Sequence, residues 1–279
     1  MREISAQKIV DTVKRLCIEA NCHLSPDIQA RLVSFREKET WPQAQEILDR
    51  IIENYRIADA ENAPICQDTG MACVFLKIGQ QVHIDGDLTE AVNEGVRRGY
   101  TEGYLRKSVV QDPLNRINTG DNTPAILYTE LVPGDRVEIT VAPKGFGSEN
   151  MSKIKMLRPS DGVQGVKDFV VQAVEEAGPN PCPPIVVGVG IGGTFDKAAF
   201  LAKKALLRNA DSGNPNPFYA QLEEEMLEKI NALGIGPQGF GGRTTALAVN
   251  IETLPTHIAG LPVAVNINCH VTRHQKEVL

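Results

Sequence analysis

An apolar stretch that runs into a glycine-rich turn and then into a helix sets the strongest limit on the architecture of this chain. A strand is predicted from Ile185 to Val189, the glycines fall in Gly188-Val-Gly-Ile-Gly-Gly193, and a helix is predicted over Thr194 to Arg208. This order matches the strand, G-x-G-x-x-G turn and helix of dinucleotide sites, in which an acidic residue ends a second strand about 20 positions later. Here that region, Asn209 to Pro215, is a polar turn with no second strand before it. We therefore interpret the glycines as a tight strand-to-helix turn and exclude a Rossmann fold.

Helical periodicity dominates the start of the chain. Ser5 is placed to cap a helix whose apolar residues share one face, and Ser25-Pro26 has the cap-then-proline start of a second helix. A third helix is predicted from about Trp41 to Ala60. We expect residues 1–62 to form an N-terminal helical layer of one domain that spans 1–279.

The remaining segments alternate between strand and helix patterns, which predicts a mixed α/β (α+β) fold: a helical layer followed by a sheet-containing region with flanking helices. The first two strands, Met71 to Ile78 and Gln81 to Ile84, are expected to pair as a hairpin or as neighbours. Further strands are predicted over 125–131, 136–142, 245–251 and 262–267, and further helices over 88–105, 162–177 and 217–233.

The composition excludes several classes of protein. The chain has 279 residues, of which 42% are hydrophobic and 23% charged, and its formal net charge is −6. An acidic chain is not expected to bind nucleic acid over a broad surface. No apolar run approaches the roughly 20 residues of a membrane span, and the first residues lack the apolar core of a secretion signal, so we expect a cytoplasmic protein.

The six cysteines divide into two groups. In a cytoplasmic chain of this length they are expected to be free thiols or metal ligands rather than a disulfide framework. We interpret Cys17, Cys22 and Cys73 as buried structural residues, because they fall in helical or apolar strand segments. The other three, Cys66, Cys182 and Cys269, each fall in a loop beside a strand. Three thiolates are one short of the four ligands that usually complete an iron–sulfur cube, and the iron left open would be a Lewis acid.

Three further polar segments are candidates for function. The loop Ala63 to Gly70, bounded by Pro64 and Gly70, sets a thiol, an amide and a carboxylate side by side in Cys66-Gln67-Asp68. A polar loop covers 106–123, and Lys144 to Lys153 is either an anion-binding glycine loop or a solvated loop. His270 and His274 would share a face only in a helical tail, and no Glu follows His270 as a zinc-protease motif requires.

These segments together resemble one protein family over nearly the whole chain. The chain is similar to the α subunit of the two-subunit, iron–sulfur-dependent class I fumarate hydratases and their relatives, the L-tartrate dehydratases. The resemblance rests on the following motifs: Ile65-Cys-Gln-Asp-Thr-Gly70, Lys144-Gly-Phe-Gly-Ser-Glu-Asn150, Cys182-Pro-Pro, Gly188-Val-Gly-Ile-Gly-Gly193, Gly241-Gly-Arg-Thr-Thr245 and Asn268-Cys-His270.

The resemblance implies a metal centre. Cys66, Cys182 and Cys269 match the residues that hold a [4Fe–4S] cluster, one iron of which lacks a protein ligand and faces the substrate. Such a ligand set is implied by the family and does not follow from spacing alone.

The resemblance also implies a substrate site. Gln67 and Asp68 match pocket residues, with Asp68 a candidate for proton transfer, and Arg106 matches an arginine that binds a substrate carboxylate through its planar fork. Gly147 lies in the loop whose backbone N–H would contact substrate. Phe146 departs from the family pattern, because a third glycine is common there.

The implied activity is the reversible addition of water to fumarate to give L-malate, a step of the tricarboxylic acid cycle. In single-chain relatives a C-terminal domain supplies further catalytic residues, and this sequence ends at Leu279. The resemblance therefore implies a separate β subunit, in an α₂β₂ assembly, and a small dicarboxylate substrate. Two alternatives stay open: an L-tartrate dehydratase α subunit, and a non-catalytic iron–sulfur or scaffold subunit.

Overall fold

The computed structural model describes residues 1–279 and separates into two compact units. Unit 1 contains Met1–Leu24, Tyr55–Phe146 and Arg273–Leu279, and unit 2 contains Ser25–Asn54 and Gly147–Thr272. Each unit has its own sheet and its own helices, in agreement with the predicted mixed α/β class.

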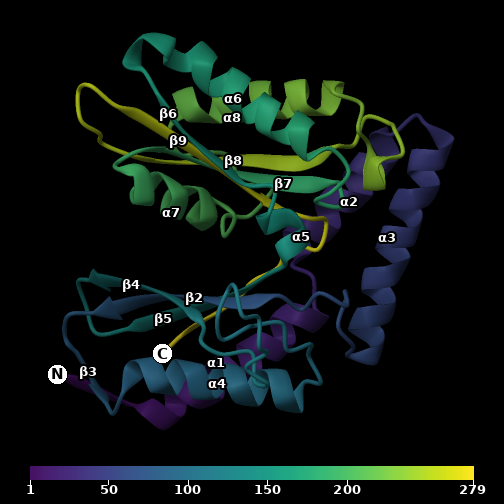
Figure 1. The fold of residues 1–279 in the computed structure, drawn as a ribbon. Helices are drawn as coiled ribbons and strands as arrows, with labels where there is room; N and C mark the ends of the chain where they lie inside the picture. Colours follow the sequence, from purple (N-terminus) through teal and green to yellow (C-terminus); the bar gives the residue numbers. More distant parts are fainter. The chain divides into compact units, whose positions relative to one another are not determined.

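Unit 1 is built on a mixed four-stranded sheet with the order β10-β5-β2-β4, in which β2 runs parallel to β4 and antiparallel to β5. Its helices α1 and α4 pack together beside this sheet (Figure 1). A second, two-stranded parallel sheet pairs β1 with β3. The bounds of these elements are β1 Arg2–Ser5, α1 Ala6–Cys22, β2 Met71–Gly79, β3 Val82–Asp85, α4 Leu88–Glu102, β4 Ile126–Val132, β5 Val137–Lys144 and β10 Gln275–Val278.

The predicted pairing of the first two long strands is wrong. β2 pairs with β4 and β5, whereas β3 pairs with β1, an N-terminal strand that the sequence pattern did not reveal. The residues between β2 and β3 do not turn back, because the N–H groups of Gln80 and Gln81 donate to the carbonyls of Val132 and Gly134 in the β4–β5 connection. These bonds satisfy the backbone without a hairpin.

The three predicted N-terminal helices are confirmed. α1 begins after Ser5, whose hydroxyl accepts the N–H of Lys8 as an N-cap, and α2 covers Pro26–Lys38. α3 covers Pro42–Glu61. The helices differ in their surroundings, because α1 buries its apolar face in the core of unit 1, α2 belongs to unit 2, and α3 contains residues of both units.

Unit 2 is a second four-stranded sheet, with the order β6-β9-β7-β8, in which β7 and β8 are parallel and β9 is antiparallel to both β7 and β6. Helices α6 and α8 cover one face of this sheet and α7 covers the other (Figure 1). The bounds are α5 Phe146–Glu149, β6 Lys153–Leu157, η1 Pro159–Asp161, α6 Gly162–Ala177, β7 Ile185–Gly192, α7 Phe195–Ala205, α8 Pro217–Ala232, η2 Pro237–Gly239, β8 Ala246–Leu254 and β9 Leu261–Asn268.

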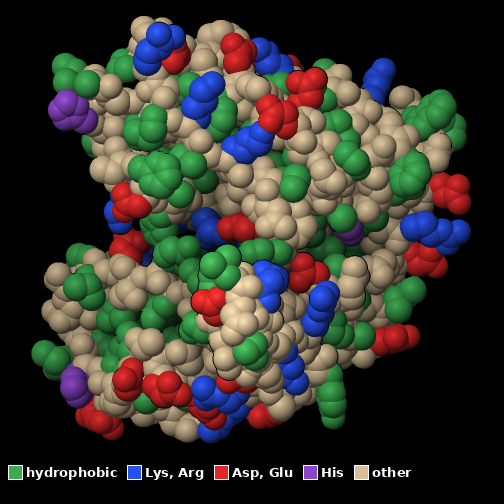
Figure 2. All heavy atoms as spheres, in the orientation of Figure 1, with side chains coloured by type: hydrophobic (Ala, Val, Ile, Leu, Met, Phe, Trp, Pro, Cys, Tyr) green, Lys and Arg blue, Asp and Glu red, His purple; other side chains and the backbone are tan.

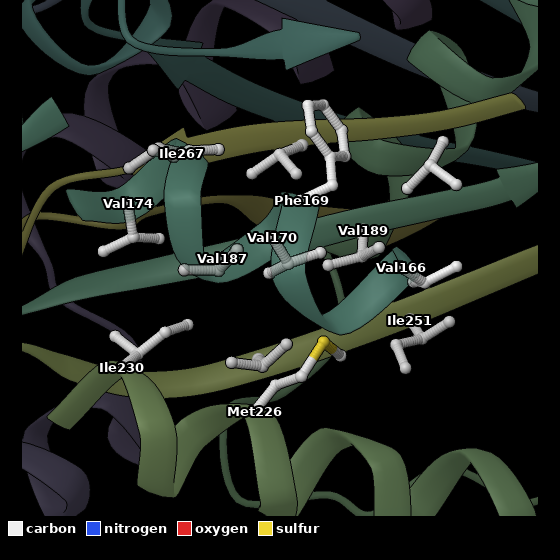
Figure 3. Packing of buried hydrophobic residues seen from close by; sticks show 14 of the residues in the cluster. Val166, Phe169, Val170, Val174, Val187, Val189, Met226, Ile230, Ile251 and Ile267 are labelled. Atoms are coloured by element: carbon white, nitrogen blue, oxygen red, sulfur yellow. The ribbon is translucent and has the colours of Figure 1, made fainter. Parts of the chain in front are cut away.

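The glycine-rich motif has a packing role in β7. Its valines Val187 and Val189 point into the core between the sheet and helices α6 and α8 (Figure 3). Successive side chains of a strand point to opposite faces, so Gly188 and Gly190 face α7. A Cβ atom at either position would lie 2.1 Å from a carbonyl oxygen of α7, that of Ala202 or of Ala198. The glycines therefore allow α7 to lie directly on the strand.

The surface carries no single-signed field on the face shown in Figure 2, where Lys and Arg side chains alternate with Asp and Glu. None of the helices combines the length and the apolarity that crossing a bilayer requires.

Candidate functional site

The six cysteines separate by burial as predicted. All are free, and Cys17, Cys22 and Cys73 are buried. Burial raises the pKa of the Cys17 thiol to about 12, so this thiol stays protonated at neutral pH. The three candidate ligands are more accessible, because Cys66 and Cys269 are half-buried and Cys182 is exposed.

In unit 1, the loop that carries Cys66 is ordered by its own backbone. The N–H of Ile65 donates to the carbonyl of Asn21 in α1 at 3.0 Å, which fixes the entry to the loop. The N–H of Asp68 points at the Cys66 sulfur, 3.4 Å away, and the N–H of Gly70 donates to Asp68 Oδ1 at 3.0 Å. The loop thus presents the thiol and the carboxylate from consecutive turns of backbone.

Asp68 is held from two further directions. Its Oδ2 accepts the N–H of Phe146 at 3.0 Å, and its carbonyl accepts Nη2 of Arg273 at 2.5 Å. The chain passes close to Lys144 at Gly70, where φ is +73° and a Cβ atom would lie 2.7 Å from the Lys144 backbone. Glycine is required at Gly70 for both reasons. The Asp68 side chain is half-buried, so it stays accessible to a small ligand.

A buried hydrogen-bond network joins this loop to the segment that carries Arg106. The Thr69 hydroxyl donates to the Arg106 carbonyl at 3.1 Å, and the Tyr100 hydroxyl donates to the Thr69 carbonyl at 2.7 Å. Asn122, which is fully buried, donates to the Gly70 carbonyl at 3.1 Å and accepts the N–H of Ser108 at 2.7 Å. The Arg106 side chain itself is exposed. The network therefore fixes the backbone on both sides of Arg106 and leaves its guanidinium to solvent or ligand.

In unit 2, Cys182 and the segment after β9 lie together. The Cys182 carbonyl accepts the N–H of His270 at 3.4 Å, and His270 Nδ1 lies 3.0 Å from the same oxygen. Gln238 joins this group, because its Nε2 lies 3.2 Å from His270 Nδ1 and 2.7 Å from the Pro183 carbonyl. Cys182 has a φ of +54°, a left-handed conformation that a non-glycine residue adopts at a cost of about 1 kcal/mol.

The structure brings the predicted residues together in two groups. In unit 1, the loop of Cys66, Gln67 and Asp68 is bonded to the Arg106 segment. The Gln67 side chain is exposed, and its Oε1 lies 3.4 Å from the Cys66 sulfur. Unit 2 joins Cys182 to Cys269 through the neighbouring His270. Gly147 is exposed and lies in unit 2, in the single turn α5. Within either unit, no three His, Cys, Asp or Glu side chains are grouped closely enough to hold a metal ion.

The structure answers two questions that the sequence left open, about the segment 144–153 and about the tail after His270. The segment from Lys144 to Lys153 is not an open glycine loop, because α5 occupies its centre and Lys144 is buried. The tail after His270 is not helical, since residues 271–274 form no regular element and β10 follows, so the condition for a shared helical face of His270 and His274 is not met.

Sequence reasoning missed several residues that support the site, namely Tyr100, Asn122, Gln238 and Arg273. Asn122 lies in the polar loop that was singled out, and its φ of +63° is a backbone state that Asn tolerates better than most residues. Tyr100 and Arg273 gave no local signal, because their partners are more than 30 residues away in the chain.

Comparisons with known proteins give a consistent result. The sequence profile of the family described as Fumarate hydratase (Fumerase) matches residues 10–278. A protein of Methanocaldococcus jannaschii, provisionally named L(+)-tartrate dehydratase subunit alpha, is 46% identical over 273 residues, which is 95% of this chain and 95% of the relative. The L(+)-tartrate dehydratase subunit alpha of Escherichia coli K12 is 32% identical over 276 residues, 98% of this chain and 91% of the relative. The protein of the same name from Shigella sonnei gives the same values.

Proposed function

This chain belongs to the fumarate hydratase family, and we propose that it is the α subunit of an iron–sulfur-dependent hydro-lyase that interconverts fumarate and L-malate. The observation that carries the proposal is the network of unit 1, which fastens the Cys66-Gln67-Asp68 loop to the Arg106 segment through Thr69 and Asn122. Such a network holds a thiol, a carboxylate and an arginine within one small region, as a hydroxy-acid site requires.

The proposed cofactor is a [4Fe–4S] cluster held by Cys66, Cys182 and Cys269. The donor set fits this group, because these three thiols are accessible and in loops whereas the other three are buried. When bound, the cluster would supply an iron without a protein ligand, which acts as a Lewis acid toward a substrate hydroxyl.

The residues of the chain itself have separate tasks in this proposal. Arg106 binds a substrate carboxylate, since its side chain is exposed while its backbone is fixed by Thr69. Asp68 donates a proton from its carboxyl group to the departing hydroxyl oxygen in the direction of dehydration. Two backbone N–H groups, from Gly70 and Phe146, orient this carboxyl group. Gln67, exposed beside Cys66, supplies an amide for a substrate oxygen, and Gly147 a backbone N–H.

A second substrate is favoured by a specific observation. The relative at 32% identity carries the name L(+)-tartrate dehydratase subunit alpha, and the relative at 46% carries the same name provisionally. L-Tartrate has one more hydroxyl group than L-malate and would lose water by the same chemistry to give oxaloacetate. The residues of this site do not distinguish the two, because a carboxylate-binding arginine and a proton-donating Asp serve both substrates equally.

The proposed partner is a separate β subunit in an α₂β₂ complex. The relatives' names as subunit alpha support a β partner. The β subunit would supply the base that removes the proton from the carbon next to the hydroxyl-bearing carbon. A cytoplasmic location is part of the proposal, and the six free cysteines support it, since extracellular proteins tend to pair theirs.

The deciding experiment measures iron, acid-labile sulfide and turnover on protein purified without oxygen, with and without the co-expressed β subunit. We expect about four iron and four sulfide per α chain, as such cubes contain, with turnover of L-malate only when both chains are present. Turnover of L-tartrate but not of L-malate would show that the substrate is L-tartrate rather than L-malate. A cluster without turnover of any hydroxy acid would favour the non-catalytic alternative, and turnover by cluster-free protein would contradict the mechanism.

A further inference from the structure

Arg273 is a buried cation without a counter-charge. Its side chain lies within unit 1 at only 4% exposure, and its Nη2 donates to the Asp68 carbonyl at 2.5 Å. Its Nε is buried and has no hydrogen-bond partner, and the structure gives the guanidinium no carboxylate. A buried charge is costly unless it is paired, so this arrangement needs an explanation.

Arg208 shows what a compensated arginine looks like in the same protein. In unit 2 its Nη2 lies 2.6 Å from Glu223 Oε1, and it also donates to Asn250 at 3.0 Å. The side-chain exposures of Arg208 and Glu223 are 17% and 7%. The Nε atoms of both arginines lack a partner, but Arg208, although it is less buried, has an anionic partner, which Arg273 lacks.

Three titratable residues lie near Arg273, and none forms an ion pair with it. The nearest, Asp68, directs its carboxylate oxygens to the N–H groups of Gly70 and Phe146. Burial raises the pKa of Cys22, with the positive charge of Arg273 opposing that rise. Burial also raises the pKa of Tyr100, which is fully buried. Both groups are neutral at physiological pH, so neither compensates the guanidinium.

The place where an anion belongs is indicated by the contacts of Asp68. Its carbonyl accepts from Arg273, and its N–H points at the Cys66 sulfur at 3.4 Å. An anion bound through Cys66 would therefore lie near the guanidinium. Opposite charges attract each other more strongly in a partly buried site than at the surface, because water screens them less.

We propose that Arg273 is a positioning residue that supplies the counter-charge for an anionic iron–sulfur cluster bound through Cys66, while it holds the Asp68 backbone in place. This inference rests on the proposed function. It makes a prediction opposite to that of an ordinary structural arginine: the guanidinium is unfavourable in the cluster-free chain and favourable in the loaded one.

The test compares Arg273→Met with Arg273→Lys and with the control Arg208→Met, each in the full α chain co-expressed with β. Melting temperatures are measured without oxygen before and after cluster loading, together with the rate at which a chelator removes iron. We expect Arg273→Met to leave the cluster-free melting temperature unchanged or raised, to lower that of the loaded protein, and to speed iron loss about tenfold or more. Arg273→Lys, which keeps the charge, is expected to restore most of the iron retention.

The control separates a structural role from the proposed one. Arg208→Met leaves Glu223 buried without its cation, so it should lower both melting temperatures by the same amount. The inference would be overturned if Arg273→Met lowered the melting temperatures of the cluster-free and loaded proteins equally, or lost iron at the wild-type rate. The hydro-lyase function would still stand in that case if the wild-type complex kept its iron and its turnover. A wild-type complex that takes up no iron would overturn both.

Discussion

The loop that carries Cys66 in unit 1 and the loop that carries Cys182 in unit 2 differ in how many side chains their hydrogen bonds hold in place. The Cys66 loop accepts hydrogen bonds from distant segments, including those of Tyr100, Asn122 and Arg273. The Cys182 loop follows helix α6 and is closed by a short turn, in which the Cys182 N–H donates to the Pro179 carbonyl at 3.0 Å. Its long-range bonds, from His270 and Gln238, are accepted by the backbone carbonyls of Cys182 and Pro183.

This difference indicates that the two loops have different functions. A loop that must place a thiol, an amide and a carboxylate together needs many fixed points, because each side chain would otherwise sample several positions. A loop that presents a thiol alone needs only a fixed backbone. We therefore expect changes around Cys66 to affect chemistry and changes around Cys182 to affect mainly metal retention.

The largest effect is expected from the cysteines themselves. Cys66→Ala and Cys182→Ala should each abolish turnover and reduce iron content strongly, since a cube that loses one of three protein thiolates is poorly held. Cys73→Ala, a buried strand cysteine, is the matched control and should keep both iron and turnover. Iron analysis of anaerobic preparations gives the answer, and wild-type iron content in Cys66→Ala would remove this thiol from the metal site.

Asp68→Asn should lower catalysis without affecting metal retention, unlike a change in the Cys182 loop. The amide cannot donate an acidic proton, so we expect kcat to fall about 10²- to 10⁴-fold, the usual range for a lost general acid or base. Iron content should stay near that of the wild type, because Asp68 is not a proposed ligand. A variant with wild-type kcat would show that the proton comes from another group.

The network of unit 1 should be more sensitive than that of unit 2. Asn122→Ala leaves the Gly70 carbonyl and the Ser108 N–H without their partner in a fully buried place, which should cost about 2–3 kcal/mol of unfolding free energy. Gln238→Ala removes a half-buried amide and should cost about 1 kcal/mol.

Urea unfolding of both variants measures this difference. We also expect Asn122→Ala to raise KM for the dicarboxylate, because the Arg106 segment loses its tie to the Cys66 loop. Equal stability losses in the two variants would contradict the contrast between the loops.

A second carboxylate sharpens the contrast with Asp68. Glu39 in unit 2 is 2% exposed and accepts five hydrogen bonds, from the N–H groups of Thr40, Trp41, Arg243 and Thr244 and from the Thr244 hydroxyl. Burial alone raises the pKa of Glu39, but the hydrogen bonds from Trp41, Thr244, Arg243 and Thr40 together hold it below its ordinary value.

Glu39 is expected to act on stability alone. Folding lowers the pKa of Glu39, so the ionised side chain stabilises the folded protein. This stabilisation is fully present above the ordinary pKa of 4.5 and is lost as the pH falls through the lower pKa of the folded state. Glu39→Gln should cost about 1–3 kcal/mol at pH 7 and less near pH 4, with kcat unchanged. A gap between variant and wild type that widens on acidification would contradict this sign.

Much of the local structure follows from the sequence. The helices are identified by apolar periodicity and by caps such as Ser5, and the burial of Cys17 and Cys73 follows from their apolar surroundings. The family motifs identify the candidate thiols and Asp68, because those residue types are tied to one chemistry.

Tertiary structure decided which segments become neighbours. β3 pairs with β1, which lies far from it in the chain. In β7, valines face α6 and glycines face α7. Tyr100, Asn122 and Arg273 likewise bond to residues far away in the chain. Periodicity and capping act over a few residues, so they determine an element from its own sequence. A strand partner or a buried charge depends on what the rest of the chain brings beside it, which is why the uncompensated guanidinium of Arg273 is visible only in the folded protein.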